Sequence, residues 1–528
     1  MKKQRNKFIQ GAFILTLAGI VSKILSAFYR IPIQNLTGDL GFYFYQQIYP
    51  MIAFMMILAL YSFPAAISKM GAQIGIQRYS LRYFIIPNAI ILFCIQFALA
   101  LLIYIAAPHL ANLVGDSRLA DGYVVVAFSL LFVPLLALIR GLYQASGEME
   151  VTAISQVIEQ IVRVGLIVFI AMMIAIGNMD IGAIAPYGVL ASALGMIVAT
   201  IYALSKYIHS RKNGVKIENS LPSEIPYGYY IKTLIFFGFA VALNHMMFII
   251  VQLADVLTVV PLLEKYGLTI QEAIKWKGVF DRAVPLIQLG MVIGSSFALA
   301  LIPYIANAKQ EKEEKKETIQ EAIAISMYIA GGAVVGLFIL YPETNMLLFK
   351  DLNGLLSMRV FIISIVLLAF LMTINAILQS YGHIFRTASY VGLLFMIKIG
   401  LNLIFIPKLG LLGAALASLV SLFILCIVTA RYFKRKFRHL ALFAQLKKKA
   451  YLMSLLTMSL VLLMMKWLVP MPVLRPYLMV YVLTLVTLGA VVYFIMLLRH
   501  DALTDKQLQT LPLGHIWLQL EKRIGKKN

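Results

Sequence analysis

The residues of this 528-residue chain that are best suited to chemistry are basic side chains inside long apolar runs. They are Lys23, Arg30, Arg163, Arg282 and Lys398. A cation near the centre of a bilayer costs about 2.5 to 3.5 kcal/mol on the insertion scale, so it is expected to face protein or a water-filled cavity. Arginine and lysine are the usual ligands of phosphate groups. The five cations therefore predict a cavity that binds an anion, with a phosphate as its preferred group.

Lys23 and Arg30 lie seven residues apart in the first apolar run, "SKILSAFYR". This spacing places both on one face of a helix, together with Ser26, as expected for one wall of a cavity. Counted from Lys7, Lys23 lies about 24 Å along the helix and is therefore deep in the membrane. Arg30 lies about 35 Å along, within reach of the outer headgroups, so anchoring of the helix is its alternative role.

Arg163 and Lys398 have different polar neighbours along the chain. Arg163 follows Glu159 by one helical turn, so an intrahelical ion pair is the alternative to a cavity role for Arg163. Lys398 has no acid one turn away, only Asn402 one turn on. This difference favours a cavity function for Lys398 more than for Arg163.

The acidic and titratable residues inside the apolar runs are few. Asp255 lies at the outer end of one predicted span, while Asp281 and Arg282 open the next, and we expect these groups to pair across the loop. The helix dipole also favours an acid such as Asp281 in a first turn. His245, inside a span, is either a hydrogen-bonded core residue or a proton-linked group. With five cations against Glu159, Asp255 and Asp281, the predicted cavity is net positive and suits an anion.

The remaining candidates are two prolines and two cysteines. Pro64 and Pro303 lie in equivalent predicted spans, where each frees backbone carbonyls and provides a hinge. Cys94 and Cys426 fall in different spans on an apolar background, so we expect neither a disulfide nor a metal site. We expect no cofactor and no catalytic residue, and the chain is not predicted to be an enzyme.

The elements that must position these residues are membrane-spanning helices. The chain is 61% hydrophobic and 13% charged, far outside the range of soluble globular proteins. A spanning helix needs about 20 predominantly apolar residues, and such stretches recur from end to end. We therefore expect an all-α polytopic membrane protein of fourteen transmembrane helices. They are predicted at approximately 8–33, 42–68, 83–107, 121–143, 151–176, 181–207, 230–257, 280–305, 319–341, 358–380, 384–407, 410–432, 450–469 and 474–498.

Topology explains the net charge of +23. With the N-terminus inside, the cytoplasmic segments hold 32 of the 46 Lys and Arg residues and the outer loops hold nine. Positive residues collect on the cytoplasmic face of membrane proteins. The even number of spans then places both termini in the cytoplasm, and the basic segments are expected to contact anionic lipid. No nucleic-acid partner is needed to account for the charge.

The chain also contains an internal repeat. The segment "QASGEMEVTAISQVIEQIVRVGL" aligns without gaps, at an offset of 235 residues, with "QSYGHIFRTASYVGLLFMIKIGL", which sets Arg163 beside Lys398. Six spans separate the copies, so the two halves have the same orientation, and parallel repeats of this kind are typical of transporters. We expect an N-terminal half at 1–207, a cytoplasmic linker at 208–229, a second half at 230–432, a basic cytoplasmic loop at 433–449, two additional helices at 450–498 and a cytoplasmic tail at 499–528.

Several segments carry a resemblance to a known superfamily. They are "SKILSAFYRIPIQNLTGDLGFYFYQQIYP" with the later "FPAAISKM", then "RGLYQASGEM", and "IPKLGLLGAALASLVS". Together with the arrangement of six, six and two spans, they resemble the multidrug/oligosaccharidyl-lipid/polysaccharide (MOP) exporter superfamily. Within it the chain is most similar to the polysaccharide transporter branch, which includes stage V sporulation protein B-like proteins and lipid II flippases.

The resemblance implies a flippase of the bacterial plasma membrane. Its substrate would be an undecaprenyl-pyrophosphate-linked oligosaccharide or peptidoglycan precursor, moved from the inner to the outer leaflet by alternating access. In the lipid II flippases, first-helix basic residues are thought to contact the pyrophosphate, and Lys23 falls on such a position. The last two helices help to form a groove for the polyprenyl tail. The second first-helix arginine of those proteins falls where this chain has Tyr29 rather than Arg30, which suits the polysaccharide branch better than lipid II.

Two alternatives come from other functional classes. A cation-coupled multidrug exporter of the same superfamily usually has twelve helices and acids in its cavity. A multi-pass lipid-dependent transferase would need acidic or metal-binding residues in substantial loops at a bilayer face. The expected partners are the anionic glycolipid substrate, membrane lipid and cell-envelope synthesis enzymes, with the protein itself a monomer.

Overall fold

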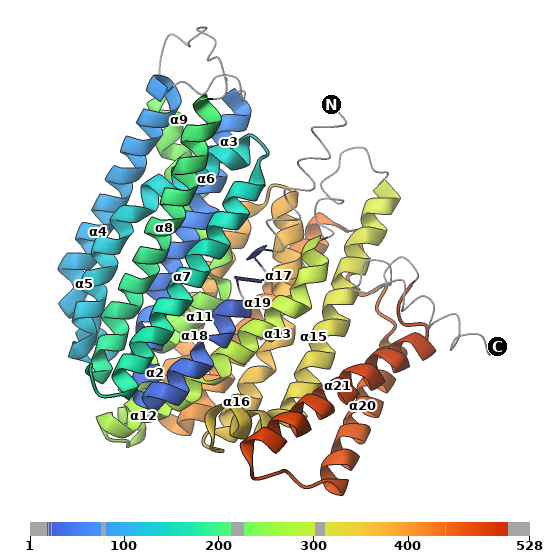
Figure 1. Cartoon of the computed structure of the whole chain (residues 1–528). Helices are drawn as coiled ribbons and strands as arrows, with labels where there is room; N and C mark the ends of the chain where they lie inside the picture. The colour runs from blue at the N-terminus through green and yellow to red at the C-terminus, as the bar shows by residue number, and fades with distance from the viewer. Residues whose placement is uncertain are drawn as a thin grey trace. The chain divides into compact units, whose positions relative to one another are not determined.

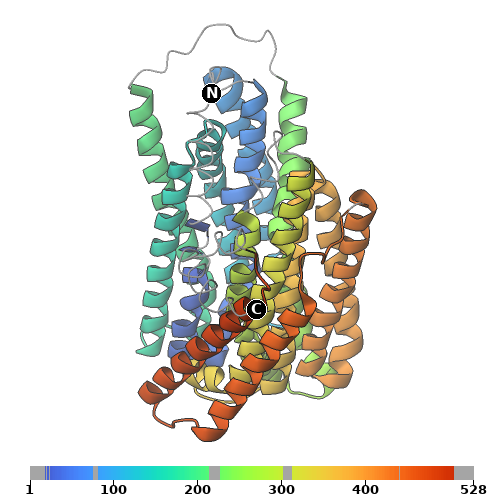
Figure 2. The same cartoon turned by 90° about the vertical axis from the view of Figure 1, so that its right-hand side faces the viewer.

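The computed structural model, shown in Figures 1 and 2, describes residues 18–19, 21–22, 24–74, 81–212, 226–300, 312–438 and 440–504. Within these ranges every regular element is a helix. Contacts divide the chain into two units, one of the residues up to Asp281 with Ile384–Gly410, and one of Arg282–His383 with the residues from Leu411 onward. The predicted all-helical, multi-pass architecture is confirmed.

Twelve α-helices of the first unit have described bounds. They are α2 (Arg30–Ile57), α3 (Phe63–Ile74), α4 (Ile86–Val114), α5 (Ala120–Ser129), α6 (Val133–Ala145), α7 (Met149–Ala175), α8 (Ile184–Lys212), α9 (Tyr227–Lys232), α10 (Gly238–His245), α11 (Met247–Tyr266), α12 (Ile270–Asp281) and α18 (Ile384–Leu409). Three π-helical segments, η1 (Leu58–Ser62), η3 (Leu81–Ile85) and η7 (Thr233–Phe237), and three 3-10 turns, η4 (Ser117–Leu119), η5 (Leu130–Phe132) and η6 (Ile181–Ala183), complete it.

The second unit contains seven α-helices within the ranges that the structure describes. They are α13 (Ala283–Ala300), α15 (Lys312–Phe349), α16 (Leu355–Ile362), α17 (Ser364–Ser380), α19 (Leu411–Lys436), α20 (Lys448–Leu468) and α21 (Arg475–Arg499). Helix α18, which belongs to the predicted half 230–432, packs in the first unit against α10 and α11. The contact units therefore cut across the predicted halves, and the division by repeat stays a prediction.

Gly38 turns the chain between the first two predicted spans. A helical run of 50 residues, Ile24–Gln73, is interrupted inside α2 by Gly38, whose φ of 68° and ψ of −171° are non-helical. Such a positive φ favours glycine, because a Cβ would clash with the backbone. An uninterrupted helix of this length would measure about 75 Å, far more than the roughly 30 Å of a bilayer core. The segment "TGDLG" therefore lies where two passes must separate.

The number of spans agrees with the prediction only in part. Twelve helical runs in the described ranges are long and apolar enough to cross a membrane, and Ile24–Gln73 is long enough for two passes. Helix α13 falls in the predicted eighth span, whose end lies outside the described residues. The exact count of fourteen and the placement of the termini stay predictions.

Two irregular helical segments of the first unit contact each other. The π-helical segment η1 replaces α-helical geometry just before Pro64, and the turn at Met246 separates α10 from α11. Tyr61 of η1 stacks on His245 with ring centroids 4.2 Å apart, and the Ser62 hydroxyl donates to the Gly238 carbonyl at 2.7 Å. π-Helical segments are frequent at functional sites. The hinge role of Pro64 stays a prediction, and Pro303 lies outside the described residues.

Gly195 allows α8 to approach α7 closely. A Cβ at Gly195 would lie 2.7 Å from the backbone oxygen of Glu159 and 3.5 Å from the Cβ of Arg163. Contacts below 3.0 Å essentially never occur at real Cβ atoms, so only glycine fits here without a shift of the backbone. The close packing holds the segment of α7 that carries Glu159 and Arg163 against its neighbour.

Glycines of α15 also allow close contacts with α20 and α21 inside the second unit. Cβ atoms at Gly331 and Gly332 of α15 would overlap the rings of Tyr451 and Tyr493. The Tyr493 hydroxyl donates to the Tyr328 carbonyl at 2.7 Å. Apolar side chains of α15, α20 and α21 form one buried cluster around these contacts.

We expect Gly195→Ala to destabilise the protein by about 1–3 kcal/mol, because it overpacks the contact between α8 and α7. Gly165→Ala is the matched control, since a Cβ added at Gly165, also on α7, would meet nothing within 4 Å. Thermal denaturation of both variants in detergent measures the difference. Equal midpoints would show that the close approach at Gly195 does not constrain the fold.

Candidate functional site

Arg30, at the start of α2, is fully buried in the first unit against an aromatic ring. Its guanidinium lies 4.0 Å from the centre of the Tyr49 ring. None of its three nitrogens has a hydrogen-bond partner among the residues that the structure describes, and no described carboxylate forms an ion pair with it. Tyr45 contacts the rings of both Tyr29 and Tyr49. Arg30 is thus a buried charge that faces the ring of Tyr49.

Arg163, on α7, is the second fully buried arginine of this region. Its Nη2 donates to the Ser26 hydroxyl at 2.8 Å and to the Gln160 side-chain oxygen at 2.9 Å. Its guanidinium carbon lies 5.5 Å from the centre of the Tyr29 ring. Only neutral oxygens accept these hydrogen bonds. We call Arg30, Arg163, Tyr29, Tyr45 and Tyr49 the arginine–tyrosine cluster.

The alternative pair of Glu159 with Arg163 is not formed. Glu159 instead accepts a hydrogen bond at 2.8 Å from Nη2 of Arg140, on α6, and both side chains are buried. Arg140 also donates from Nε to the Ser155 hydroxyl at 2.9 Å. Arg140 was not a predicted site residue, although it lies inside the predicted span at 121–143. The pair neutralises the charge of Glu159 and leaves Arg163 without a carboxylate.

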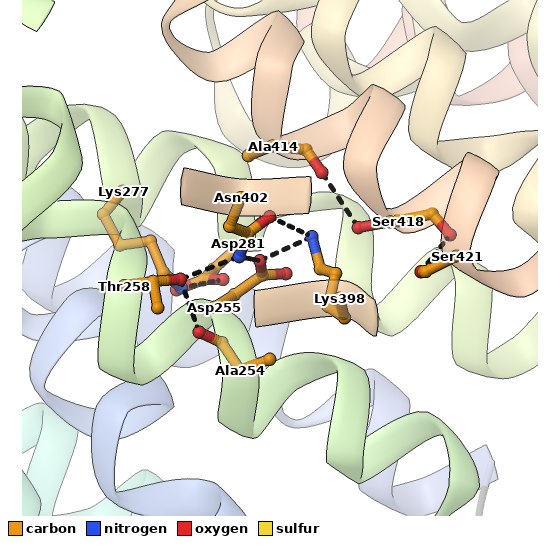
Figure 3. A network of polar contacts seen from close by, with 10 residues as sticks. All are labelled: Ala254, Asp255, Thr258, Lys277, Asp281, Lys398, Asn402, Ala414, Ser418 and Ser421. Carbon is orange, nitrogen blue, oxygen red and sulfur yellow. Dashed lines mark hydrogen bonds and ion pairs between the residues drawn. The ribbon is translucent and has the colours of Figure 1, made fainter. Parts of the chain in front are cut away.

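Lys398 and Asp255 form a buried ion pair, shown in Figure 3. Lys398 Nζ lies 2.7 Å from Asp255 Oδ1 and donates to Asn402 Oδ1 at 2.8 Å. The Asn402 amide nitrogen donates to Asp255 Oδ1 at 3.0 Å and to the Thr258 hydroxyl at 2.7 Å. These bonds join α18 to α11 inside the first unit. The ammonium of Lys398 is therefore neutralised in this structure.

The expected pairing of Asp255 with Asp281 and Arg282 is replaced by other partners. Asp281 pairs with Lys277, one turn earlier on α12, at 2.6 Å. Arg282 binds both carboxylate oxygens of Asp351, at 2.7 and 2.9 Å, in the second unit. Burial acts to raise the pKa of Asp351, but the hydrogen bonds from Arg282 outweigh it and hold that pKa below its ordinary value. The sequence analysis did not predict a role for Asp351, because its partner Arg282 is far away in the sequence.

Three other predicted residues complete the picture. Lys23 and Pro303 lie outside the described residues, so their predicted roles stay predictions. His245 is stacked on Tyr61 at the end of α10. The arginine–tyrosine cluster thus unites two of the five predicted cations, Arg30 and Arg163, while Arg282 and Lys398 each have a carboxylate partner.

The second unit contains an apolar cavity of about 470 Å³. It is lined by residues of α13, α15, α17, α20 and α21, among them Leu286, Gly332, Ile365, Met458 and Gly489. Gly336, which also lines the cavity, has no side chain, and a Cβ added there would meet nothing within 4 Å. The lining is apolar apart from Thr344 and Tyr493, so the cavity is suited to a hydrocarbon chain.

We expect Arg140→Gln to destabilise the protein by about 3–5 kcal/mol, because it leaves the carboxylate of Glu159 buried without its ion-pair partner. Arg118→Gln is the matched control. Arg118 also forms a 2.8 Å ion pair, with Asp116, but its side chain is 52% exposed, and such pairs contribute about 1 kcal/mol or less. Thermal denaturation in detergent compares the two, and similar midpoints would contradict the assigned importance of the buried pair.

Comparison with known proteins places these features in a family. Residues 8–309 match the family described as "Polysaccharide biosynthesis protein". The uncharacterized membrane protein YabM of Bacillus subtilis is 33% identical over 79% of this chain and 78% of its own. Stage V sporulation protein B of the same organism is 23% identical over 81% of this chain and 83% of its own. The structure of a lipid II flippase MurJ in an inward closed conformation is 14% identical, covers 92% of this chain and 98% of its own, and has a TM-score of 0.67. The chain therefore belongs to the family described as "Polysaccharide biosynthesis protein" and is a multi-pass membrane protein whose fold is that of the lipid II flippase structure.

Proposed function

We propose that the protein flips an undecaprenyl-pyrophosphate-linked oligosaccharide or peptidoglycan precursor from the inner to the outer leaflet by alternating access. The observation that carries the proposal is the arginine–tyrosine cluster, where Arg30 and Arg163 are buried with no carboxylate partner in the described part of the chain. A pyrophosphate supplies the missing negative charge. Family membership supports the transport function, and relatives that move lipid-linked precursors support this class of substrate.

The electrostatics of the cluster favour a multiply charged anion. Taking a guanidinium out of water costs several kcal/mol unless a counter-charge and hydrogen bonds offset it. Tyrosine π faces and neutral oxygens offset only part of that cost. Arg30 faces the ring of Tyr49, and Arg163 faces the ring of Tyr29. Their guanidinium groups offer several N–H donors, and such donors suit phosphate oxygens. Tyrosine hydroxyls in the same cluster add donors for the sugar next to the phosphate.

The apolar cavity of the second unit supports a substrate with a hydrocarbon tail. It is bounded by α20 and α21, the two helices predicted to follow the repeated halves. A polyprenyl chain is uncharged and flexible, and an apolar cavity open between helices lowers the cost of holding it beside the protein. We therefore propose that the second unit, taken by itself, binds the tail in this cavity.

The other predicted cations enter the proposal differently. Lys398 and Arg282 have Asp255 and Asp351 as partners, so a phosphate contact by either cation requires its ion pair to open. Opening and closing of the ion pair between Lys398 and Asp255 would then accompany each transport cycle. Lys23 belongs to the proposed binding set through its position in the sequence motif.

We expect Arg30→Gln to lower the rate of lipid-linked substrate translocation in proteoliposomes by about tenfold to hundredfold, the equivalent of one or two charged hydrogen bonds. The same change should leave the thermal midpoint unchanged or raise it, because it removes a buried charge that has no described counter-ion. This combination separates binding from folding. A loss of stability without loss of translocation would contradict the assigned role.

Depletion of the protein in cells identifies the substrate directly. We expect a precursor that carries a polyprenyl diphosphate to accumulate on the cytoplasmic side of the membrane, and mass spectrometry of extracted lipids to detect it. Restored expression of the wild-type protein should clear it, whereas Arg163→Gln should not. Changed drug resistance without such accumulation would instead favour the multidrug exporter.

A further inference from the structure

The end of α19, the start of α20 and the loop between them form a strongly basic surface. From Leu352 to His500 the chain contains fifteen Lys and Arg residues and no Asp or Glu. Eight of the fifteen lie between Arg431 and Lys449, and all eight are exposed. In the ranges that the structure describes, none of the eight pairs with a carboxylate. The surface therefore has a positive charge that no part of the described chain neutralises.

Specific contacts hold this loop against the second unit. The backbone N–H of Lys447 donates to the Tyr328 hydroxyl of α15 at 2.8 Å. Gln320, also on α15, donates to the Ala441 carbonyl at 3.0 Å. The Phe443 ring stacks on Phe370 of α17 with centroids 5.9 Å apart. These contacts give the lysines that follow a defined position beside α15.

Lys447, Lys448 and Lys449 lie at the start of α20, the end of this helix that the predicted topology places toward the cytoplasm, and we call them the lysine cluster. Helix α20 begins at Lys448 and reaches the cavity at Met458, ten residues further on, or about 15 Å along the helix. Tyr328, which accepts the hydrogen bond from Lys447, in turn accepts one from Tyr493, a residue that lines the cavity. Helix α20 and the hydrogen bonds of Tyr328 thus connect the lysine cluster to the lining of the cavity.

The stability of α20 does not explain the lysine cluster. Cations in the first turn of a helix lie at the positive end of its dipole, where acids are favoured. The first turn of α20 contains no acid and has no side-chain cap. The general excess of positive residues in cytoplasmic loops accounts for cations on this face, but it does not select the positions next to the cavity.

We propose that the lysine cluster binds the phosphate of a polyprenyl-phosphate lipid in the cytoplasmic leaflet while its tail occupies the apolar cavity. This inference rests on the proposed function and adds a loading site, separate from the arginine–tyrosine cluster, at which the substrate first binds. The charges are complementary, because three ammonium groups face a headgroup that is anionic at neutral pH. One cavity also matches a lipid with one tail better than a phospholipid with two.

The test measures binding of undecaprenyl diphosphate to the purified full-length protein in phosphatidylcholine nanodiscs. The triple variant Lys447→Gln, Lys448→Gln and Lys449→Gln is expected to bind at least about tenfold more weakly than wild type, given the attraction that each basic residue contributes near a charged lipid surface. The matched control is Lys434→Gln, Arg435→Gln and Lys436→Gln, which removes the same charge from the end of α19, a helix that does not line the cavity. This control should weaken binding by less than about twofold.

A second variant guards against a local change of structure. Lys447 Nζ donates to the Asp501 carbonyl, so the double variant Lys448→Gln and Lys449→Gln keeps that contact while it removes two of the three charges. Weakened binding in the double variant supports the site. Equal losses in the triple variant and its matched control would overturn it, because the effect would then come from general surface charge.

Competition decides between the two sources of phosphate. An excess of phosphatidylglycerol should not displace undecaprenyl diphosphate, and equal displacement would overturn the proposal in favour of a bulk-lipid site. Translocation assays separate this inference from the proposed function. Binding that depends on the lysines in a protein that translocates nothing would contradict the proposed function alone, whereas translocation with binding that ignores the lysines would contradict the loading site alone.

Discussion

The burial of positive charge in an apolar interior is the constraint on which the rest of this structure depends. A cation inside a membrane protein needs a counter-charge or a polar neighbour, because the surrounding lipid provides neither. Four ion pairs meet this need within single units: Arg140 with Glu159, Lys398 with Asp255, Lys277 with Asp281, and Arg282 with Asp351. Arg30 and Arg163 differ from these four, because their described neighbours are tyrosine rings, neutral oxygens and, for Arg163, the Met56 sulfur. The contrast distinguishes charges that hold helices together from charges that are left for a ligand.

Local backbone features place the arginine–tyrosine cluster. Gly38 turns the chain between two passes, so that Arg30 and the tyrosines that follow it come from adjacent helical segments. Gly195 lets α8 approach α7 closely at Glu159 and Arg163, and the pair between Arg140 and Glu159 joins α6 to the same segment of α7. In the second unit, Gly336 of α15 has the opposite effect, because it leaves open space beside the apolar lining of the cavity. The first unit thus offers buried positive charge, which suits an anionic headgroup. The second unit offers an apolar cavity, which suits a hydrocarbon tail.

The sequence predicted the helical, multi-pass architecture, because hydropathy acts locally along the chain. It also predicted that Arg30 and Arg163 are intramembrane cations. Partners were harder to predict, because Lys398 and Asp255 come from helices far apart in the sequence, and Glu159 has cationic neighbours in space as well as one turn away. The apolar cavity left no signal in the sequence, because cavity volume depends on how side chains of five helices fail to fill the space between them. Lys23, the deepest predicted cation, lies outside the described residues and its role stays a prediction.

The most direct test of the central claim is a structure of the protein with undecaprenyl diphosphate bound. The account predicts phosphate oxygens about 2.7–2.9 Å from guanidinium nitrogens of both Arg30 and Arg163, the range of charge-assisted hydrogen bonds. It also predicts that Arg140 keeps its bond to Glu159 in the same structure. A bound pyrophosphate that contacts neither Arg30 nor Arg163 would contradict the account.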